Sequence, residues 1–207
     1  MMSARMTEKG NIIMTYPSSV AVFCGSKFGA DPMHEASARA LGEGLAERNI
    51  RLVYGGGGIG LMGAVATSAL DKGGEVKGII PEFMMKMEVG DLPGVDQELT
   101  DSMHSRKRRM FELSDAFVAI SGGLGTLDEL IEITTWKQLR LHDKPIILLN
   151  EGGYWDDFAR MFENIIEGGF ASEANASLIT VVDSVEKVFE VLSGVAVSEI
   201  ETESNRL

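Results

Sequence analysis

The chain has 207 residues, of which 44% are hydrophobic and 24% charged, and its formal net charge is −12. The length is sufficient for one domain with a full core, and the composition is ordinary for a globular protein. The acidic charge argues against general binding to nucleic acid or to anionic membranes. A single cysteine, Cys24, excludes an internal disulfide and is typical of a cytoplasmic protein. No apolar run approaches the roughly 18 residues of a membrane span.

The sequence predicts one folded domain between two flexible ends. Residues 1–17 form a predicted flexible extension, which lacks the long apolar stretch of a signal peptide. Residues 18–193 contain all the periodic apolar segments and form the predicted domain. Residues 194–207 are polar and acidic and form a predicted flexible tail.

Short apolar strands alternate with helices through the predicted domain. The strands are expected at residues 20–23, 51–54, 76–80, 115–120, 144–149 and 178–182. The helices are expected at residues 31–48, 60–72, 101–113, 154–167 and 184–192, with another behind residue 126. Asp31 and Pro32 are an N-cap and a first-turn residue typical of a helix start. This alternation predicts a single α/β domain with a doubly wound, mostly parallel, Rossmann-like sheet.

Residues 81–100 break the alternation. The segment holds three methionines, Pro93 and several acids. It fits a lid or a partner-facing loop, and methionines that fill an irregular core are an equally good interpretation.

The stretch Ser121–Glu129 is the most informative part of the chain. An apolar run leads into Gly122, Gly123 and Gly125, and an apolar-periodic segment follows, which predicts a strand, a glycine turn and a helix. Glycines bring backbone N–H groups close to a ligand, and a helix N-terminus favours an anion. The alternative is structural, because Thr126 and Glu129 have the spacing of a capping box.

Other candidate features are expected at the same edge of the sheet. A second glycine loop follows residue 54 and offers Gly57 and Gly58, and Ser26 follows the first strand. In a doubly wound sheet, ligands bind at the carboxyl ends of the strands. The glycine spacing, with Glu82 downstream, also satisfies a dinucleotide fingerprint, which leaves a nicotinamide-dependent oxidoreductase as an alternative.

A basic run at Arg106–Arg109 is the densest in the chain. Successive helical residues point about 100° apart, so only one or two of the four can face a pocket. Arg106 and Lys107 are the better candidates for a phosphate, and Arg108 and Arg109 are expected on a solvated face. The three histidines lack metal-ligand spacing, so we expect no metal site.

Several motifs together resemble the LOG ("lonely guy") family. They are Tyr54–Gly63, Met103–Lys107, Gly122–Glu129, Trp136–Leu139, His142–Pro145 and Leu149–Asn150. The resemblance covers roughly residues 20–192 in the family's order. The family comprises cytokinin riboside 5′-monophosphate phosphoribohydrolases, which release the free base (cytokinin or adenine) and leave ribose 5-phosphate. Many of its members have carried a lysine decarboxylase label, but nothing in this sequence indicates a pyridoxal phosphate site.

The resemblance also implies roles for individual residues. Arg106 and Glu129 correspond to the family's catalytic pair. The implied substrate contacts are Glu88, Lys107, Gly122, Gly123, Leu124, Gly125, Thr126 and Thr135. A nucleoside 5′-monophosphate ligand and a homodimer are implied, and the chemistry requires no cofactor.

One position departs from the family pattern. Ser121 stands where the family has proline, which would fix φ before the glycines. A non-catalytic nucleotide sensor or carrier is a further alternative, although the presence of both Arg106 and Glu129 speaks against it.

Overall fold

A seven-stranded parallel sheet forms the centre of the computed structural model, which describes residues 5–6, 12–13, 15–85 and 92–194. Its strand order is β6-β5-β4-β3-β7-β8-β9, and every neighbouring pair is parallel. The strands are β3 (Ser19–Phe23), β4 (Arg51–Tyr54), β5 (Val76–Pro81), β6 (Asp96–Thr100), β7 (Ala116–Ala119), β8 (Ile146–Leu149) and β9 (Thr180–Val182). The predicted doubly wound Rossmann-like sheet is therefore confirmed.

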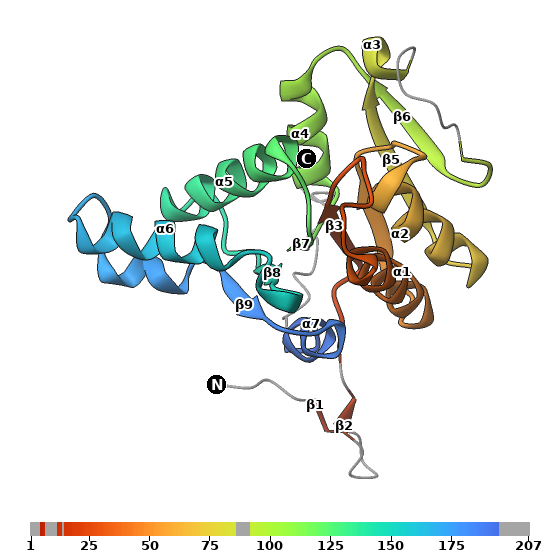
Figure 1. The fold of residues 1–207 in the computed structure, drawn as a ribbon. Coiled ribbons are helices and arrows are strands. Elements are labelled where there is room, and N and C mark those ends of the chain that lie inside the picture. Colours follow the sequence, from red (N-terminus) through yellow and green to blue (C-terminus); the bar gives the residue numbers. More distant parts are fainter. Residues whose placement is uncertain (1–4, 7–11, 14, 86–91, 195–207) are drawn as a thin grey trace, which may run out of the picture.

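Helices cover both faces of this sheet (Figure 1). They are α1 (Pro32–Glu47), α2 (Gly60–Asp71), α3 (Glu82–Met85), α4 (Met103–Glu112), α5 (Leu124–Gln138), α6 (Asp156–Glu167) and α7 (Val185–Leu192). Short 3-10 helices at Glu151–Gly153 and Glu173–Ser177 flank α6. Outside the sheet, Arg5–Met6 (β1) pairs antiparallel with Ile12–Ile13 (β2). Among the described helices, none has the length and apolar character needed to span a membrane.

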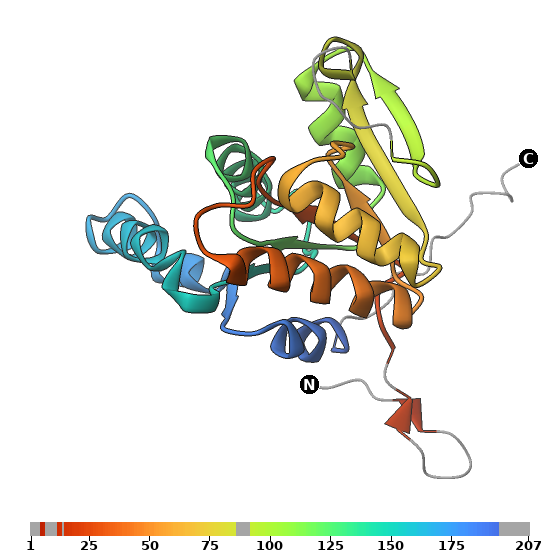
Figure 2. The same cartoon turned by 45° about the vertical axis from the view of Figure 1, so that its right-hand side comes forward.

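The central strand β3 shows why two layers of helices are needed. Val20 and Val22 belong to a buried cluster with residues of α1, α2 and α7. Ala21 and Phe23 point to the opposite face and join a cluster with residues of α4 and α5. Successive side chains of a strand point to opposite faces, so a continuous apolar run must be covered on both sides. Figure 2 shows α1 and α2 packed side by side on one of these faces.

The predicted start of α1 is confirmed by its capping contact. The Asp31 side chain accepts a hydrogen bond from Met33 N at 2.9 Å, and Pro32 is the first helical residue. At α4 the cap is Ser102, whose hydroxyl accepts from Ser105 N at 3.2 Å in a reciprocal capping box. These local contacts fix the residues at which α1 and α4 begin.

Two sequence interpretations differ from the structure. The segment 81–100 contains a regular strand, β6, which pairs along β5. The sequence did not predict β6 because this strand lacks a continuous apolar run. It is an edge strand, and its acidic side chains pair with Lys77 and Arg109. The capping box at Thr126 is not formed: α5 begins earlier, its N-cap is Gly123, and Thr126 and Glu129 lie buried inside the helix.

Strand order places the candidate site. The chain moves from β3 to β4 on one side, while β7 lies on the other side of β3. The loops that follow β3, β4 and β7 therefore leave the same edge of the sheet around the point where the winding reverses. In open α/β sheets this is where ligands bind.

Candidate active site

A cavity of about 270 Å³ lies at this edge, and we call it the Glu129 cavity. Seven of the residues singled out from the sequence line it together. They are Ser26, Arg106, Gly123, Leu124, Gly125, Thr126 and Glu129. These residues come from the loop after β3, from α4 and from the start of α5, so the fold brings three distant segments to one place.

The N-terminus of α5 gives the cavity its capacity to bind an anion. Its N-cap, Gly123, makes no side-chain capping hydrogen bond. The first N–H groups of a helix have no acceptor within the helix, and the helix dipole favours negative charge beside them. Since residues 123–126 line the cavity, these N–H groups are available to a phosphate or carboxylate.

Arg106 is fixed in the cavity by three contacts. Its Nε donates to the carbonyl oxygen of Ile79 at 3.1 Å, and its Nη2 donates to that of Gly55 at 3.0 Å. Its Nη1 lies 3.5 Å from Oε1 of Glu129, and the two side chains are only 7% and 9% exposed. A guanidinium held in this way is a fixed positive charge in a nearly dry site.

Gly55 is a site residue that sequence reasoning missed. A Cβ at this position would lie 2.0 Å from Nη2 of Arg106, so only glycine leaves room for the guanidinium. The sequence pattern pointed instead to Gly57 and Gly58, because nothing local distinguishes one glycine of the run from another. The sequence feature that could have identified Gly55 is its position directly after the strand β4.

Glu129 is the buried acid of the site. Burial raises its pKa from 4.5 to about 7, although the neighbouring Arg106 charge acts in the opposite direction. A carboxyl group with such a pKa is present in both protonation states near neutral pH. It can therefore accept a proton from water or give one to a leaving group.

Apolar side chains complete the Glu129 cavity. Met62, Met84 and Met103 line it together with Val22. Polarizable thioethers and aliphatic groups suit a flat apolar ring, so this wall is suited to a nucleobase. Cys24 also lines the cavity, and burial raises the pKa of its thiol well above the usual range, which keeps it neutral.

Some predicted contacts lie away from the Glu129 cavity. Lys107 Nζ lies 3.0 Å from Asp128 Oδ2 and 3.1 Å from Glu132 Oε2, which turns it toward α5. Thr135 is exposed on α5, where its hydroxyl donates to the Ile131 carbonyl at 2.8 Å.

The remaining predicted residues are placed as follows. Gly57 and Gly58 do not line this cavity. Glu88 lies outside the described residues. Gly122 does not line the Glu129 cavity but lines the larger cavity beside it, and a Cβ there would come within 2.1 Å of Thr126 Oγ1, so this position also requires glycine. The described residues hold no group of three His, Cys, Asp or Glu side chains placed to bind a metal ion.

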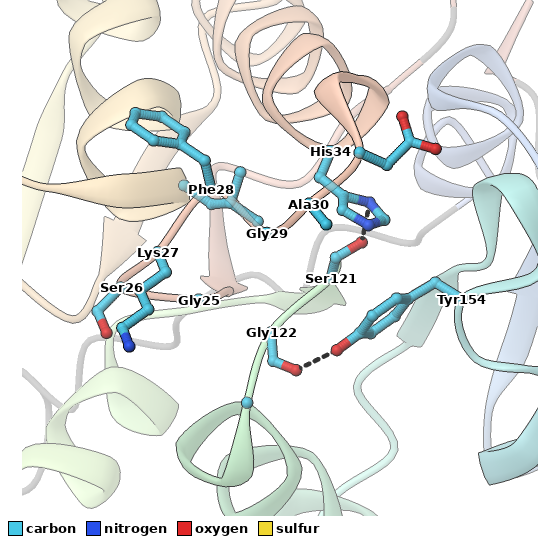
Figure 3. A pocket seen from close by; sticks show the side chains of 13 residues that line it. Gly25, Ser26, Lys27, Phe28, Gly29, Ala30, His34, Ser121, Gly122 and Tyr154 are labelled. Atoms are coloured by element: carbon cyan, nitrogen blue, oxygen red, sulfur yellow. Dashed lines mark hydrogen bonds between the residues drawn. The ribbon is translucent and has the colours of Figure 1, made fainter.

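A second cavity, of about 590 Å³, adjoins the first, and we call it the His34 cavity (Figure 3). The two share Gly25, Ser26 and Gly123. His34, Ser121 and Tyr154 line its far side. The sequence motifs gave no reason to connect these three residues.

Known proteins share this sequence over most of its length. The cytokinin riboside 5′-monophosphate phosphoribohydrolase LOG3 of Arabidopsis thaliana is 45% identical over 161 residues, which cover 77% of this chain and 74% of that protein. LOG1 of the same plant is 41% identical over 174 residues, covering 84% of this chain and 81% of its own. The chain belongs to the LOG family. Residues 62–192 also match a family described as "Possible lysine decarboxylase", which is the label that many LOG-family members have carried.

Solved structures share the fold of this LOG-family chain at low sequence identity. The molybdenum cofactor carrier protein of Chlamydomonas reinhardtii has a TM-score of 0.64 at 22% identity, covering 84% of this chain and 94% of its own. The molybdenum cofactor binding protein of Rippkaea orientalis has a TM-score of 0.63 at 24% identity, covering 86% and 96%. Likeness at this level extends to the fold alone.

Proposed function

We propose that this protein hydrolyses the N-glycosidic bond of adenosine 5′-monophosphates, including N6-modified ones, and releases the free base and ribose 5-phosphate. The observation that carries the proposal is the buried pair of Arg106 and Glu129, 3.5 Å apart, in the cavity that also receives the N-terminus of α5. The names of the LOG-family relatives support the same reaction. The family description as a possible lysine decarboxylase finds no support in these residues.

The 5′-phosphate is proposed to bind at residues 123–126. The free N–H groups of the first turn of α5 and the hydroxyls of Ser26 and Thr126 are suited to its oxygens. Arg106 adds positive charge to the same cavity. Because the phosphate is anchored at one end, the ribose is directed toward Glu129 and the base toward the methionines.

The chemical step needs a group beside C1′ that accepts and donates a proton. In the proposed reaction the bond from C1′ to the base nitrogen breaks and its electrons leave with the base. A water oxygen bonds to C1′ and Glu129 takes a proton from that water. Glu129 then passes this proton to the departing base nitrogen, directly or through solvent water, and returns to the carboxylate form. Arg106 stays protonated, so it acts by charge, holding the phosphorylated sugar and balancing the carboxylate. The positive charge that develops on the ribose is stabilised by the carboxylate, as in glycoside hydrolysis.

Two other function classes fit the site less well. A dinucleotide-dependent oxidoreductase would use the glycine loop after β4 to hold a pyrophosphate, yet Gly57 and Gly58 line neither cavity. A nucleotide carrier would have no need for a buried carboxylate paired with a buried arginine, because burying both charges is costly. Cytoplasmic location remains part of the proposal and is supported by the single buried Cys24.

The protein is also proposed to act as a homodimer. Large apolar side chains are exposed along α5 and just after it: Leu124 is 85% exposed, Leu139 64% and Leu141 66%. A second copy would remove this surface from water. Light scattering should therefore give about twice the chain mass of 22.4 kDa, and a monomer at micromolar concentration would contradict the proposal.

Base release from a panel of nucleoside 5′-monophosphates tests the proposed reaction. The purified protein is incubated with AMP and with isopentenyladenosine monophosphate, and free base and ribose 5-phosphate are quantified by chromatography. Equal amounts of the two products are expected. If neither nucleotide yields base, the proposed reaction is wrong.

A further inference from the structure

Two hydrogen bonds hold the loop just before α5 from the side of the His34 cavity. Ser121 Oγ lies 2.8 Å from Nδ1 of His34, a residue of the first turn of α1 that precedes it by 87 positions. The Tyr154 hydroxyl donates to the carbonyl oxygen of Gly122 at 2.5 Å. Figure 3 shows both bonds reaching this loop. The loop is thus tied to two elements that take no part in the proposed chemistry.

The two residues that make these bonds support each other. The rings of His34 and Tyr154 meet edge to face, with their centroids 5.1 Å apart. Tyr154 also packs edge to face against the buried Trp155, with a centroid distance of 5.0 Å. These ring contacts orient the His34 ring nitrogen and the Tyr154 hydroxyl toward the loop, although the Tyr154 side chain is itself 43% exposed.

This loop needs an external support. Gly122 and Gly123 have wide conformational freedom, and they lead directly into the N–H groups proposed to bind phosphate. In the LOG family a proline fixes φ before these glycines, whereas Ser121 stands there in this chain. Serine leaves φ free, but its hydroxyl offers the hydrogen-bonding group that proline lacks.

We propose that His34 and Tyr154 are positioning residues, which hold the loop Ser121–Gly123 in the conformation that binds the 5′-phosphate. The inference rests on the proposed function for the identity of the ligand. A fixed loop improves the binding of phosphate equally before and during the chemical step. Loss of either hydrogen bond should therefore raise KM and leave kcat nearly unchanged.

A double-mutant cycle separates this role from a merely structural one. KM and kcat for AMP, and Kd for ribose 5-phosphate, are measured for the wild type, His34→Ala, Ser121→Pro and the double variant. His34→Ala alone should raise KM and Kd about fivefold, the effect of one hydrogen bond. In the Ser121→Pro background the same substitution should change both by less than about twofold, because proline fixes φ and the hydroxyl is gone.

A matched control comes from the same turn of α1. Glu35 is the next residue, and its carboxylate pairs only with Arg39 among the described residues. Glu35→Ala should leave KM and Kd unchanged, which excludes a general loosening of the helix start. Equal effects of His34→Ala in both backgrounds, or a lower Tm with unchanged KM, would overturn the proposal.

Tyr154→Phe tests the second bond and remains decisive if His34→Ala does not fold. It removes only the hydroxyl and keeps the ring contacts, so KM and Kd should rise about threefold without a change in kcat. An unchanged Kd would overturn the role of Tyr154. If the wild type releases no base but these shifts in Kd for ribose 5-phosphate are seen, the proposed function fails and the positioning role stands. If base release is normal and Kd does not shift, the proposed function stands and the positioning role is wrong.

Discussion

Two glycine-rich loops leave the sheet at the same edge, and their glycines have different structural roles. In the loop after β4, Gly55 makes room for the Arg106 guanidinium, and Gly57 and Gly58 line neither cavity. In the loop after β7, Gly123 begins α5 without a side-chain cap and faces the Glu129 cavity. Glycine content alone therefore does not identify a phosphate site. Neither α2 nor α5 has a side-chain cap at its N-cap, but in the first turn of α2 the Met62 N–H donates to the Gly25 carbonyl at 3.2 Å. The start of α5 is therefore the proposed phosphate site.

The largest expected effect comes from Glu129, the acid in the helix that follows the loop after β7. Glu129→Gln keeps the size of the side chain but cannot take a proton from water. Base release from AMP should fall about a hundredfold to a thousandfold, while binding of ribose 5-phosphate is retained. Single-turnover kinetics and calorimetry measure the two quantities. A variant that keeps normal turnover would remove Glu129 from the proposed chemistry.

The next effect tests whether the loop after β7 is a phosphate site. Adenosine lacks the group that the N–H groups of residues 123–126 are proposed to bind. Loss of two charge-assisted hydrogen bonds, each contributing about 1.5 kcal/mol or more, lowers kcat/KM at least about a hundredfold. The measurement compares free-base release from AMP and adenosine. If adenosine is cleaved as well as AMP, the two loops do not differ in the proposed way.

The pH dependence of stability tests the burial of Glu129. Its pKa is about 7 in the folded protein, against 4.5 as its ordinary value. Between these values the folded protein retains a proton that the unfolded chain has released, so the free energy of unfolding falls as pH rises. Glutamine does not titrate.

The wild type should therefore lose about 2 kcal/mol of stability relative to Glu129→Gln between pH 5 and pH 8. Urea unfolding of both proteins across this range measures the difference. A difference that stays constant with pH would mean that the Glu129 carboxyl is not buried as described.

The smallest effect compares one glycine from each loop. At Gly55 a Cβ would overlap with Arg106, whereas at Gly123 no atom lies within 4 Å of one. Gly55→Ala should lower the free energy of unfolding by at least about 1 kcal/mol, because the guanidinium must move. Gly123→Ala should change it by less than that. Similar losses in the two variants, measured by urea unfolding, would contradict the difference between the loops.

Local patterns predicted most of the fold correctly. The start of α1 follows from two neighbouring residues: the Asp31 side chain caps the helix, and Pro32 fixes φ in its first turn. The strands β3 and β7 follow from continuous apolar runs, which must be buried on both faces. The edge strand β6 was missed because its acids make their contacts with Lys77 and Arg109, which are distant in sequence.

The sequence by itself determined the doubly wound architecture, the family, and the loops that meet at the edge of the sheet, because caps, turns and apolar periodicity act over a few residues. Only the tertiary structure decided which of two adjacent basic residues enters the cavity: Arg106 does, and Lys107 turns to Asp128 and Glu132. It also decided the raised pKa of Glu129 and the contact of His34 with Ser121. These three features depend on burial and on contacts between residues distant in sequence, so no local sequence pattern predicts them.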